Sequence, residues 1–259
     1  MRKFVLVAAV LLLLCPLSRS DSQDEARREL NAGTAAYRAG KIDEAITHFG
    51  AVVRLDPDSM VGHLYLGTAL AQEYIPGLED AANKQLGEGA IAEFRRVLDL
   101  KPDQLNAQKA IAALSYQMKR FDEARAFQEK IIAADPTDAE AYYAIGVIDW
   151  VQTYQPRMEL RARLGIKPNE SLIFISQCPG LRASNWDKVT DGIRMLARAI
   201  ELRPDYDDAM AYMNLIYRER ADIQCGDPTA READQVTADH WVEMTMKIKK
   251  QKAAQHKTH

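Results

Sequence analysis

The chain has few of the residue patterns that enzymes and metal sites use. It holds three cysteines and five histidines among 259 residues, with no C-x-x-C, C-x-x-C-H or H-E-x-x-H arrangement. It also lacks a G-x-S-x-G motif and a glycine-rich phosphate loop. We therefore expect no catalytic residue, no metal and no cofactor. An enzymatic role could rest only on the segment 157–187, whose pattern fits no motif.

An excess of positive charge is also missing. The chain has 34 basic and 37 acidic residues, and its formal net charge is -3. Residues 1–20 contain three of the basic residues and no acid, so the rest has 31 against 37 and a charge of -6. This balance gives no electrostatic reason to bind nucleic acid.

No apolar run is long enough to span a bilayer, which takes about 20 residues. The longest begins the chain: Arg2 and Lys3 precede the apolar stretch 4–14, and Ser18 and Ser20 then place small side chains before Asp21. This layout is typical of a cleaved signal peptide over residues 1–20. We predict an exported protein, periplasmic or secreted, with no membrane span after cleavage.

The cysteines leave two questions open. Cys15 follows Leu14, which is larger than the residue a lipoprotein box prefers, so lipid anchoring at Cys15 is the less favoured alternative to a soluble product. Export would leave Cys178 and Cys225 where disulfides form. Sequence alone does not decide whether these two are bonded or remain separate thiols.

The remaining chain contains an internal repeat. Four prolines each have a small residue twelve positions before them, a larger residue four positions after that small one, and a further marker ten positions after the proline. The prolines are Pro57, Pro102, Pro136 and Pro204; the small residues Ala45, Ala90, Ala124 and Gly192; the larger ones Phe49, Phe94, Gln128 and Leu196; the markers Gly67, Ala112, Gly146 and Asn214, with Gly33 opening the series. Small residues let paired helices approach closely, and the larger side chain fills the gap beside them. We expect each proline to open the following helix.

These spacings resemble the tetratricopeptide repeat, a unit of about 34 residues with a W-x2-L-G-x2-Y, A-x3-F, P pattern. The best matches are Leu66-Gly67, Ala45 to Phe49, Ala90 to Phe94 and the prolines. The family's Trp position never holds Trp; its occupants are Glu29, His63, Gln108, Tyr142 and Met210. The resemblance implies an all-α, right-handed superhelical solenoid of antiparallel helix pairs, similar to secreted bacterial repeat proteins of undefined function.

The predicted solenoid covers residues 21–248. Its repeats are 26–59, 60–104, 105–138 and 139–206, followed by a partial repeat and a capping helix over 207–248. The second repeat carries an insertion of 11 residues and the fourth one of 34. We expect a frayed, basic polar tail over 249–259, and helix capping by the acidic turn of Asp205, Asp207 and Asp208.

Both insertions begin with Q-x-Y-x-P, at Gln72–Pro76 and Gln152–Pro156. One interpretation is that each proline ends a lengthened helix; the other is a pair of equivalent binding ledges. Within the longer insertion, residues 156–164 favour a short basic helix, Leu172–Ile175 a strand or clamp packed on the solenoid, and Cys178–Gly180 a turn.

The resemblance also implies a concave groove lined by the first helix of each repeat. Candidate groove residues combine aromatic rings, amides and cations: Tyr37, Arg38, Gln72, Tyr74, Lys109, Tyr116, Tyr143, Trp150, Gln152 and Tyr154. Such rings suit a protein or peptide partner, with Trp150 as the main anchor, although some of them could instead pack between repeats. The predicted function is an exported adaptor that binds its partner in this groove. The alternative is a cell-envelope scaffold, lipoprotein-like, that acts through its outer face. The oligomeric state stays open.

Overall fold

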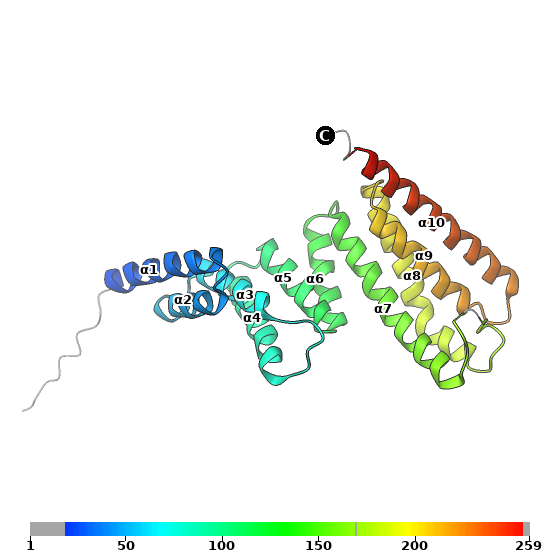
Figure 1. Cartoon of the computed structure of the whole chain (residues 1–259), viewed down its shortest axis with the longest axis horizontal. Helices are drawn as coiled ribbons and strands as arrows, with labels where there is room; N and C mark the ends of the chain where they lie inside the picture. Colours follow the sequence, from blue (N-terminus) through cyan, green and yellow to red (C-terminus); the bar gives the residue numbers. More distant parts are fainter. Residues whose placement is uncertain (1–18, 169, 256–259) are drawn as a thin grey trace, which may run out of the picture. The chain divides into compact units, whose positions relative to one another are not determined.

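The computed structural model describes residues 19–168 and 170–255, and these form ten α-helices and no strand (Figure 1). The predicted all-α class is confirmed. Most of the predicted signal segment, including Cys15, lies outside the described residues. The helices are α1 (Arg19–Arg38), α2 (Ile42–Leu55), α3 (Met60–Glu73), α4 (Ala81–Leu100), α5 (Leu105–Gln117), α6 (Phe121–Ala134), α7 (Ala139–Leu164), α8 (Cys178–Leu202), α9 (Asp207–Asp222) and α10 (Pro228–Gln255).

The helices belong to two compact units. The first contains the chain up to Tyr74 together with Ala82–Lys101, and therefore α1 to α4. The second contains Ile75–Ala81 and the chain from Pro102 onward, and therefore α5 to α10. Each unit has its own buried apolar residues, as expected when consecutive helices pack as neighbours.

The repeat prolines lie in the turns between helices. Pro57 and Pro136 directly follow Asp56 and Asp135, the C-caps of α2 and α6, and the next helices begin three residues later. The prediction that these prolines open helices was wrong. They end the preceding helix instead, because proline cannot continue it. The N-cap of α3 is Ser59, whose side chain accepts a hydrogen bond from the N–H of Gly62 at 3.3 Å.

The predicted gap-filling pairs explain how each helix pair closes. In the first repeat a Cβ on Gly33 would lie 2.6 Å from the Phe49 ring, and in the fourth a Cβ on Gly146 would lie 2.5 Å from Leu196. Neither position has room for a side chain, so glycine allows the close approach. The third repeat differs, because Gln128 replaces the aromatic residue and is only half-buried.

The two Q-x-Y-x-P segments are not equivalent. After Gln72, α3 ends at Glu73, Tyr74 is its C-cap, and Pro76 lies in the loop before α4. Pro156 instead lies inside α7, which continues to Leu164. The expectation that each proline ends a helix therefore fails for the fourth repeat, and so does the expectation of two matching ledges.

The long insertion lengthens a helix pair. α7 has 26 residues and α8 has 25, and residues 165–177 connect them. The predicted separate basic helix is the end of α7, and Cys178–Gly180 is the first turn of α8 rather than a free turn. Leu172–Ile175 forms turns and not a strand. Leu172 is fully buried, while Phe174 is 73% exposed.

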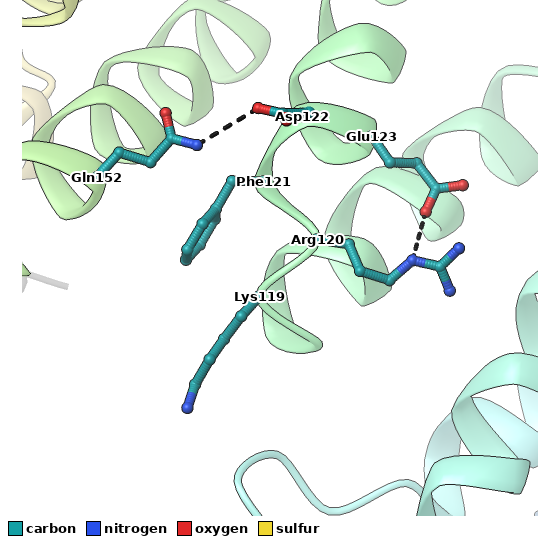
Figure 2. Close-up of a pocket in the computed structure, with 6 residues that line it drawn as sticks. All are labelled: Lys119, Arg120, Phe121, Asp122, Glu123 and Gln152. Carbon is teal, nitrogen blue, oxygen red and sulfur yellow. Dashed lines mark hydrogen bonds and ion pairs between the residues drawn. The ribbon is translucent and has the colours of Figure 1, made fainter. Parts of the chain in front are cut away.

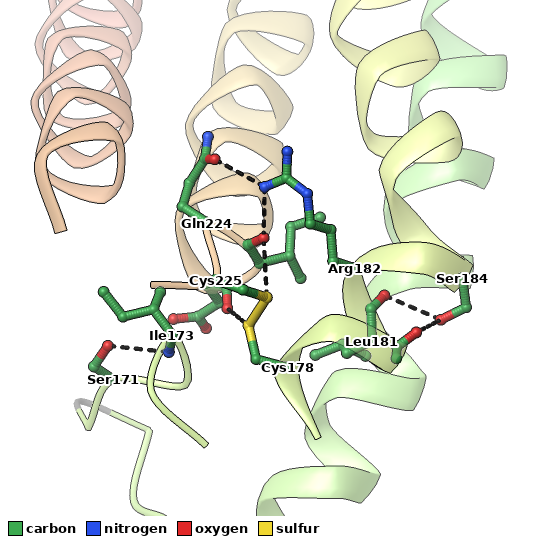
Figure 3. Close-up of a disulfide and its surroundings, with 11 residues drawn as sticks. Ser171, Ile173, Cys178, Leu181, Arg182, Ser184, Gln224 and Cys225 are labelled. Carbon is green, nitrogen blue, oxygen red and sulfur yellow. Dashed lines mark hydrogen bonds between the residues drawn. A yellow bond between two sulfur atoms is a disulfide. The ribbon is translucent and has the colours of Figure 1, made fainter. Parts of the chain in front are cut away.

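A disulfide fastens this extension, as Figure 3 shows. Cys178 at the start of α8 is bonded to Cys225 before α10, with the two Cα atoms 5.7 Å apart. Beside it, the N–H of Gly226 donates to the carbonyl of Ile173 at 2.8 Å, and Arg182 donates to the carbonyl of Ile223 at 3.0 Å. The loop 165–177 is therefore held to the region between α9 and α10.

A buried ionic network joins the end of α7 to α9. Arg157 donates two 2.7 Å hydrogen bonds to the carboxylate of Glu219 and one to Asp222. Arg161, which is 2% exposed, donates to Asp222 at 2.8 Å and to the carbonyls of Lys167 and Glu170. Burial raises the pKa of Glu219 despite these arginines. The network fixes the inserted helical turns onto the repeat that follows.

The last helix extends further than predicted. α10 continues to Gln255, so the expectation of a frayed tail is wrong for residues 249–255. Lys252 donates to the carboxylate of Asp207 at 2.6 Å, and this hydrogen bond lowers the pKa of Asp207. The acidic turn therefore pairs with α10, and the N-cap of α9 is Tyr206, without a side-chain cap bond. The prediction of capping by this turn was wrong.

Candidate functional site

The second unit contains a groove made of two adjoining pockets of about 400 and 290 Å³. Both pockets are lined by Ala113 of α5, Gln128 of α6, and Tyr143 and Ala144 of α7. The first helices of the third and fourth repeats therefore contribute to it, as the family resemblance implied. Tyr212 of α9 adds to the larger pocket.

The groove exists where the repeat departs from its own pattern. In the other complete repeats the corresponding side chain is Phe49, Phe94 or Leu196, and each is at least 98% buried. In the third repeat Gln128 stands there and lines both pockets. A polar amide thus stands where an apolar side chain packs between the two helices of the other repeats, and Gln128 lines the larger pocket together with Ala112 of α5.

Aromatic rings form one side of the groove. The ring centroid of Tyr143 lies 5.0 Å from that of Tyr206 and 5.6 Å from that of Tyr212. Burial raises the pKa of Tyr143 and Tyr212, and raises that of Tyr206 to about 12. Burial also raises the pKa of Tyr116, which lines the larger pocket. At neutral pH these phenols are uncharged and keep their hydroxyl protons for hydrogen bonding.

Polar atoms in the groove are largely uncommitted. The hydroxyls of Tyr116, Tyr143 and Tyr212 and the amides of Gln117 and Gln128 make no hydrogen bond to the part of the chain that the structure describes. A ligand can therefore use them without breaking bonds within the protein. Neutral donors and acceptors of this kind suit the backbone of a peptide.

The smaller pocket is lined by one basic side chain, Lys109, and two acidic ones, Asp138 and Glu140. Lys109 lines the smaller pocket, but its amino group lies 2.7 Å from the carboxylate of Asp138, which also caps α7. Glu140 lines the same pocket, and the charge of Asp208 contributes to the raised pKa of Tyr143. Arg203 brings a further positive charge, because its guanidinium carbon lies 4.2 Å from the ring centroid of Tyr206. The charged side chains that line the smaller pocket itself are two acids and one base.

Trp150 does not line either groove pocket. Its ring is stacked on Tyr154 with centroids 4.8 Å apart and meets Tyr212 edge-on at 5.3 Å. Its indole nitrogen is buried and has no hydrogen-bond partner within the described chain. Trp150 packs on the core of the second unit. Trp150 is therefore half-buried beside these rings and outside both groove pockets, and its role as the main anchor stays a prediction.

Gln152 opens onto a different pocket, shown in Figure 2. This space of about 330 Å³ is formed by residues 119–123 and Gln152, whose amide lies 3.5 Å from the carboxylate of Asp122. Figure 2 also shows Arg120 turned toward Glu123, at 2.8 Å. Of its charged side chains, Arg120 and Glu123 are thus paired with each other.

Four predicted groove residues belong to the first unit. Tyr37 packs against that unit's core, Arg38 and Gln72 are exposed, and Tyr74 is half-buried after the end of α3. The groove of the second unit therefore contains three of the ten predicted residues: Lys109, Tyr116 and Tyr143.

Sequence reasoning missed Gln128, Tyr206 and Tyr212. The position of Gln128 was visible, because a glutamine there interrupts a series of Phe and Leu. Tyr206 and Tyr212 had no comparable signal. They reach the groove only because α9 packs beside α7, and this tertiary packing does not follow from spacings along the chain.

Paired helices with small residues at each crossing define the class: a helical repeat protein. Family models of the tetratricopeptide repeat match residues 30–82 and 86–147. Tetratricopeptide repeat protein 13 of Homo sapiens is 25% identical over 197 residues, which cover 75% of this chain and 22% of that protein. The chain thus spans about a fifth of that curated relative. Residues 30–82 and 86–147 thus match models of the tetratricopeptide repeat.

Solved structures show the same fold. A MamA structure from Desulfovibrio magneticus RS-1 has a TM-score of 0.58 at 19% identity, covering 88% of this chain and 97% of that one. Another MamA crystal structure has a TM-score of 0.60 at 15% identity, with coverages of 90% and 96%. YrrB, described as a repeat protein with an unusual peptide-binding site, has a TM-score of 0.52 at 10% identity, with coverages of 89% and 95%.

None of the helices over 19–168 and 170–255 combines the length and the apolar character needed to cross a bilayer. The same part of the chain holds no cluster of three or more His, Cys, Asp or Glu side chains placed to bind a metal ion.

Proposed function

We propose that this protein is an exported adaptor that binds a segment of a partner protein in the groove of its second unit. The observation that carries the proposal is the set of unpaired phenols and amides around Gln128, at the one repeat that lacks its apolar plug. A helix crossing that is filled by an apolar side chain does not need unpaired phenols and amides. The peptide-binding site named for YrrB, a protein of the same fold, supports this use of the fold.

Export is supported by two independent features. The N-terminal sequence has the three regions of a signal peptide, and Cys178 is bonded to Cys225. Disulfides persist in oxidising compartments and are rare in the cytosol. We expect the exported protein to begin at Asp21. N-terminal sequencing that finds Met1, or a lipidated Cys15, would contradict this.

Photo-crosslinking tests the groove. Benzoylphenylalanine in place of Gln117, which is exposed at the larger pocket, is expected to capture a partner protein on irradiation. The matched control places the same probe at Ala126, which is exposed on α6 and lines neither groove pocket. Adding Ala113→Trp, which fills the groove from an exposed position, should abolish the Gln117 adduct. Equal capture at Ala126, or capture that survives Ala113→Trp, would refute the proposed function.

A further inference from the structure

The groove has the length of a short extended peptide. Its α5 wall runs from Lys109 to Gln117, and eight residues of α-helix rise about 12 Å. A polyproline II helix advances about 3.1 Å per residue, so about four residues of such a segment fill this length. The two pockets share Ala113 and Ala144, whose small side chains leave room for a ligand along the floor.

The uncommitted groups limit the conformation of the ligand. An α-helical ligand uses its backbone groups internally, so it would leave the phenols of Tyr143 and Tyr212 and the amide of Gln128 unsatisfied. A β-strand ligand needs a sheet edge, and the described residues contain no strand. Polyproline II has no internal hydrogen bonds and presents its carbonyls to outside donors. Phenol and amide donors beside small alanines match that backbone.

The rings favour proline as the side chain. Tyr143 contacts Tyr206 and Tyr212, so the wall contains adjacent rings rather than one isolated ring. Tyr206 is 7% exposed and Arg203 lies over its ring, so the half-buried Tyr143 and Tyr212 are the rings that a ligand can reach. Proline-rich segments dock on aromatic-lined grooves because their conformation is already fixed and little entropy is lost on binding. The phenols are uncharged, so an apolar proline ring can pack against them without covering a charge.

The acidic end of the groove specifies the flanking residue. Asp138 is neutralised by Lys109, whereas Glu140, which lines the smaller pocket, has no ion-pair partner among the described residues. Asp208 contributes to the raised pKa of Lys252, and Arg203 lies over the ring of Tyr206, 4.2 Å from its centroid. Glu140 is therefore the charge at this end that a cationic ligand residue can complement.

We infer that the groove around Gln128 binds a proline-rich segment in the polyproline II conformation, about four residues long, with a Lys or Arg at the end that meets Glu140. The inference rests on the proposed function, because it assumes that the groove is the binding site. It adds the chemical class of the partner segment.

Labelled synthetic peptides test this directly. The probes contain four prolines with two arginines after them or before them, since a polyproline II ligand can run in either direction. By fluorescence polarisation on the full mature protein, we expect one of them to bind at least tenfold more tightly than its counterpart with four alanines. Replacing its arginines by glutamates should weaken binding at least tenfold. Equal affinity for proline and alanine peptides would overturn the inference.

Conservative variants separate recognition from folding. The Tyr143→Phe, Tyr212→Phe double variant keeps both rings and removes only the hydroxyls, and should weaken the proline peptide about fivefold or more. Glu140 is exposed, and the Glu140→Gln change removes its charge. This variant should therefore prefer arginine over glutamate peptides less strongly. Unchanged affinity in the double variant would contradict the assignment of the phenols as donors.

The two proposals fail in different ways. If no proline peptide binds while Gln117 still captures a protein in a manner blocked by Ala113→Trp, the groove functions but its ligand is of another class. If the Gln117 probe captures nothing beyond the Ala126 control, the groove itself is not the binding site. Peptide binding that is insensitive to Ala113→Trp would place the proline site elsewhere and refute the inference.

Discussion

The second and fourth repeats treat an inserted segment differently. In the second repeat the extra residues form a loop after Tyr74 and additional turns at the start of α4, and Ile75 and Leu78 are exposed. In the fourth repeat the extra residues lengthen both α7 and α8 and are held by a disulfide and by buried ion pairs. An insertion that remains a loop thus needs few contacts with the rest of the protein. An insertion that lengthens helices must pack its additional helical surface against other residues.

The largest effect is expected from the buried ionic network. Arg161→Met keeps the apolar stem but removes the charge that faces Asp222, and we expect it to lower the free energy of unfolding by about 3–5 kcal/mol. The matched control is Arg96→Met in the first unit, where Arg96 and Asp58 are exposed and the pair contributes about 0–1 kcal/mol. Urea unfolding measures both. Similar losses for the two variants would remove the contrast between the units.

The disulfide is expected to come next. Replacing Cys178 and Cys225 by serine should cost about 2–4 kcal/mol, because the closed loop no longer restricts the unfolded chain. All three tryptophans, Trp150, Trp186 and Trp241, lie in the second unit, so their fluorescence reports its unfolding. A reducing agent should lower the midpoint of the parent protein to that of the variant. An unchanged midpoint in both cases would show that the bridge does not hold the extension.

Asp149 gives the second unit a pH dependence. It is 1% exposed, and burial raises its pKa from 3.8 to about 6 despite the hydrogen bond from Arg125. Because the folded pKa is above the unfolded value, this carboxyl favours folding below about pH 4, and that contribution is lost as the pH rises to about 6. Relative to Asp149→Asn, the parent should lose about 2–3 kcal/mol between pH 4 and 7. Parallel stability curves for the two proteins would contradict this.

The smallest effect on stability is expected where the repeat pattern is restored. Gln128→Phe supplies the residue that the first and second repeats have, and should change stability by about 1 kcal/mol or less. It should nevertheless abolish the Gln117 crosslink, because the ring fills the groove. Gln128→Asn, which leaves the groove open, is the control. Retained crosslinking in Gln128→Phe would show that the missing plug is unrelated to binding.

The sequence predicted the helix pairs because their rule is local. Gly33 with Phe49 and Gly146 with Leu196 are contacts that follow from fixed spacings along the chain. The prediction that Pro156 ends its helix failed for α7. The cost of a proline inside a helix, about 3 kcal/mol, is offset there by packing of the turns beyond it. Leu160 and Arg161, both buried, belong to those turns.

The candidate site was predicted less well than the fold. Tyr116 and Tyr143 both line the groove, because position in the first helix determines which way a side chain faces. Trp150 lies outside both pockets, although it occupies the same repeat position as Tyr116. Its ring packs against Tyr154 and Tyr212, and the second of these lies on α9, far away in the sequence.

The turn between α5 and α6 has a consequence for motion. Lys119 has a φ of 58°, while Gly40, at the same place in the first repeat, has a φ of 73°. A non-glycine residue in this conformation costs about 1 kcal/mol or more. The third repeat therefore combines a strained turn with a missing plug at Gln128. Because neighbouring repeats stabilise one another only locally, α5 and α6 should open before the flanking helices and exchange their amide hydrogens first, and a bound ligand should slow that exchange.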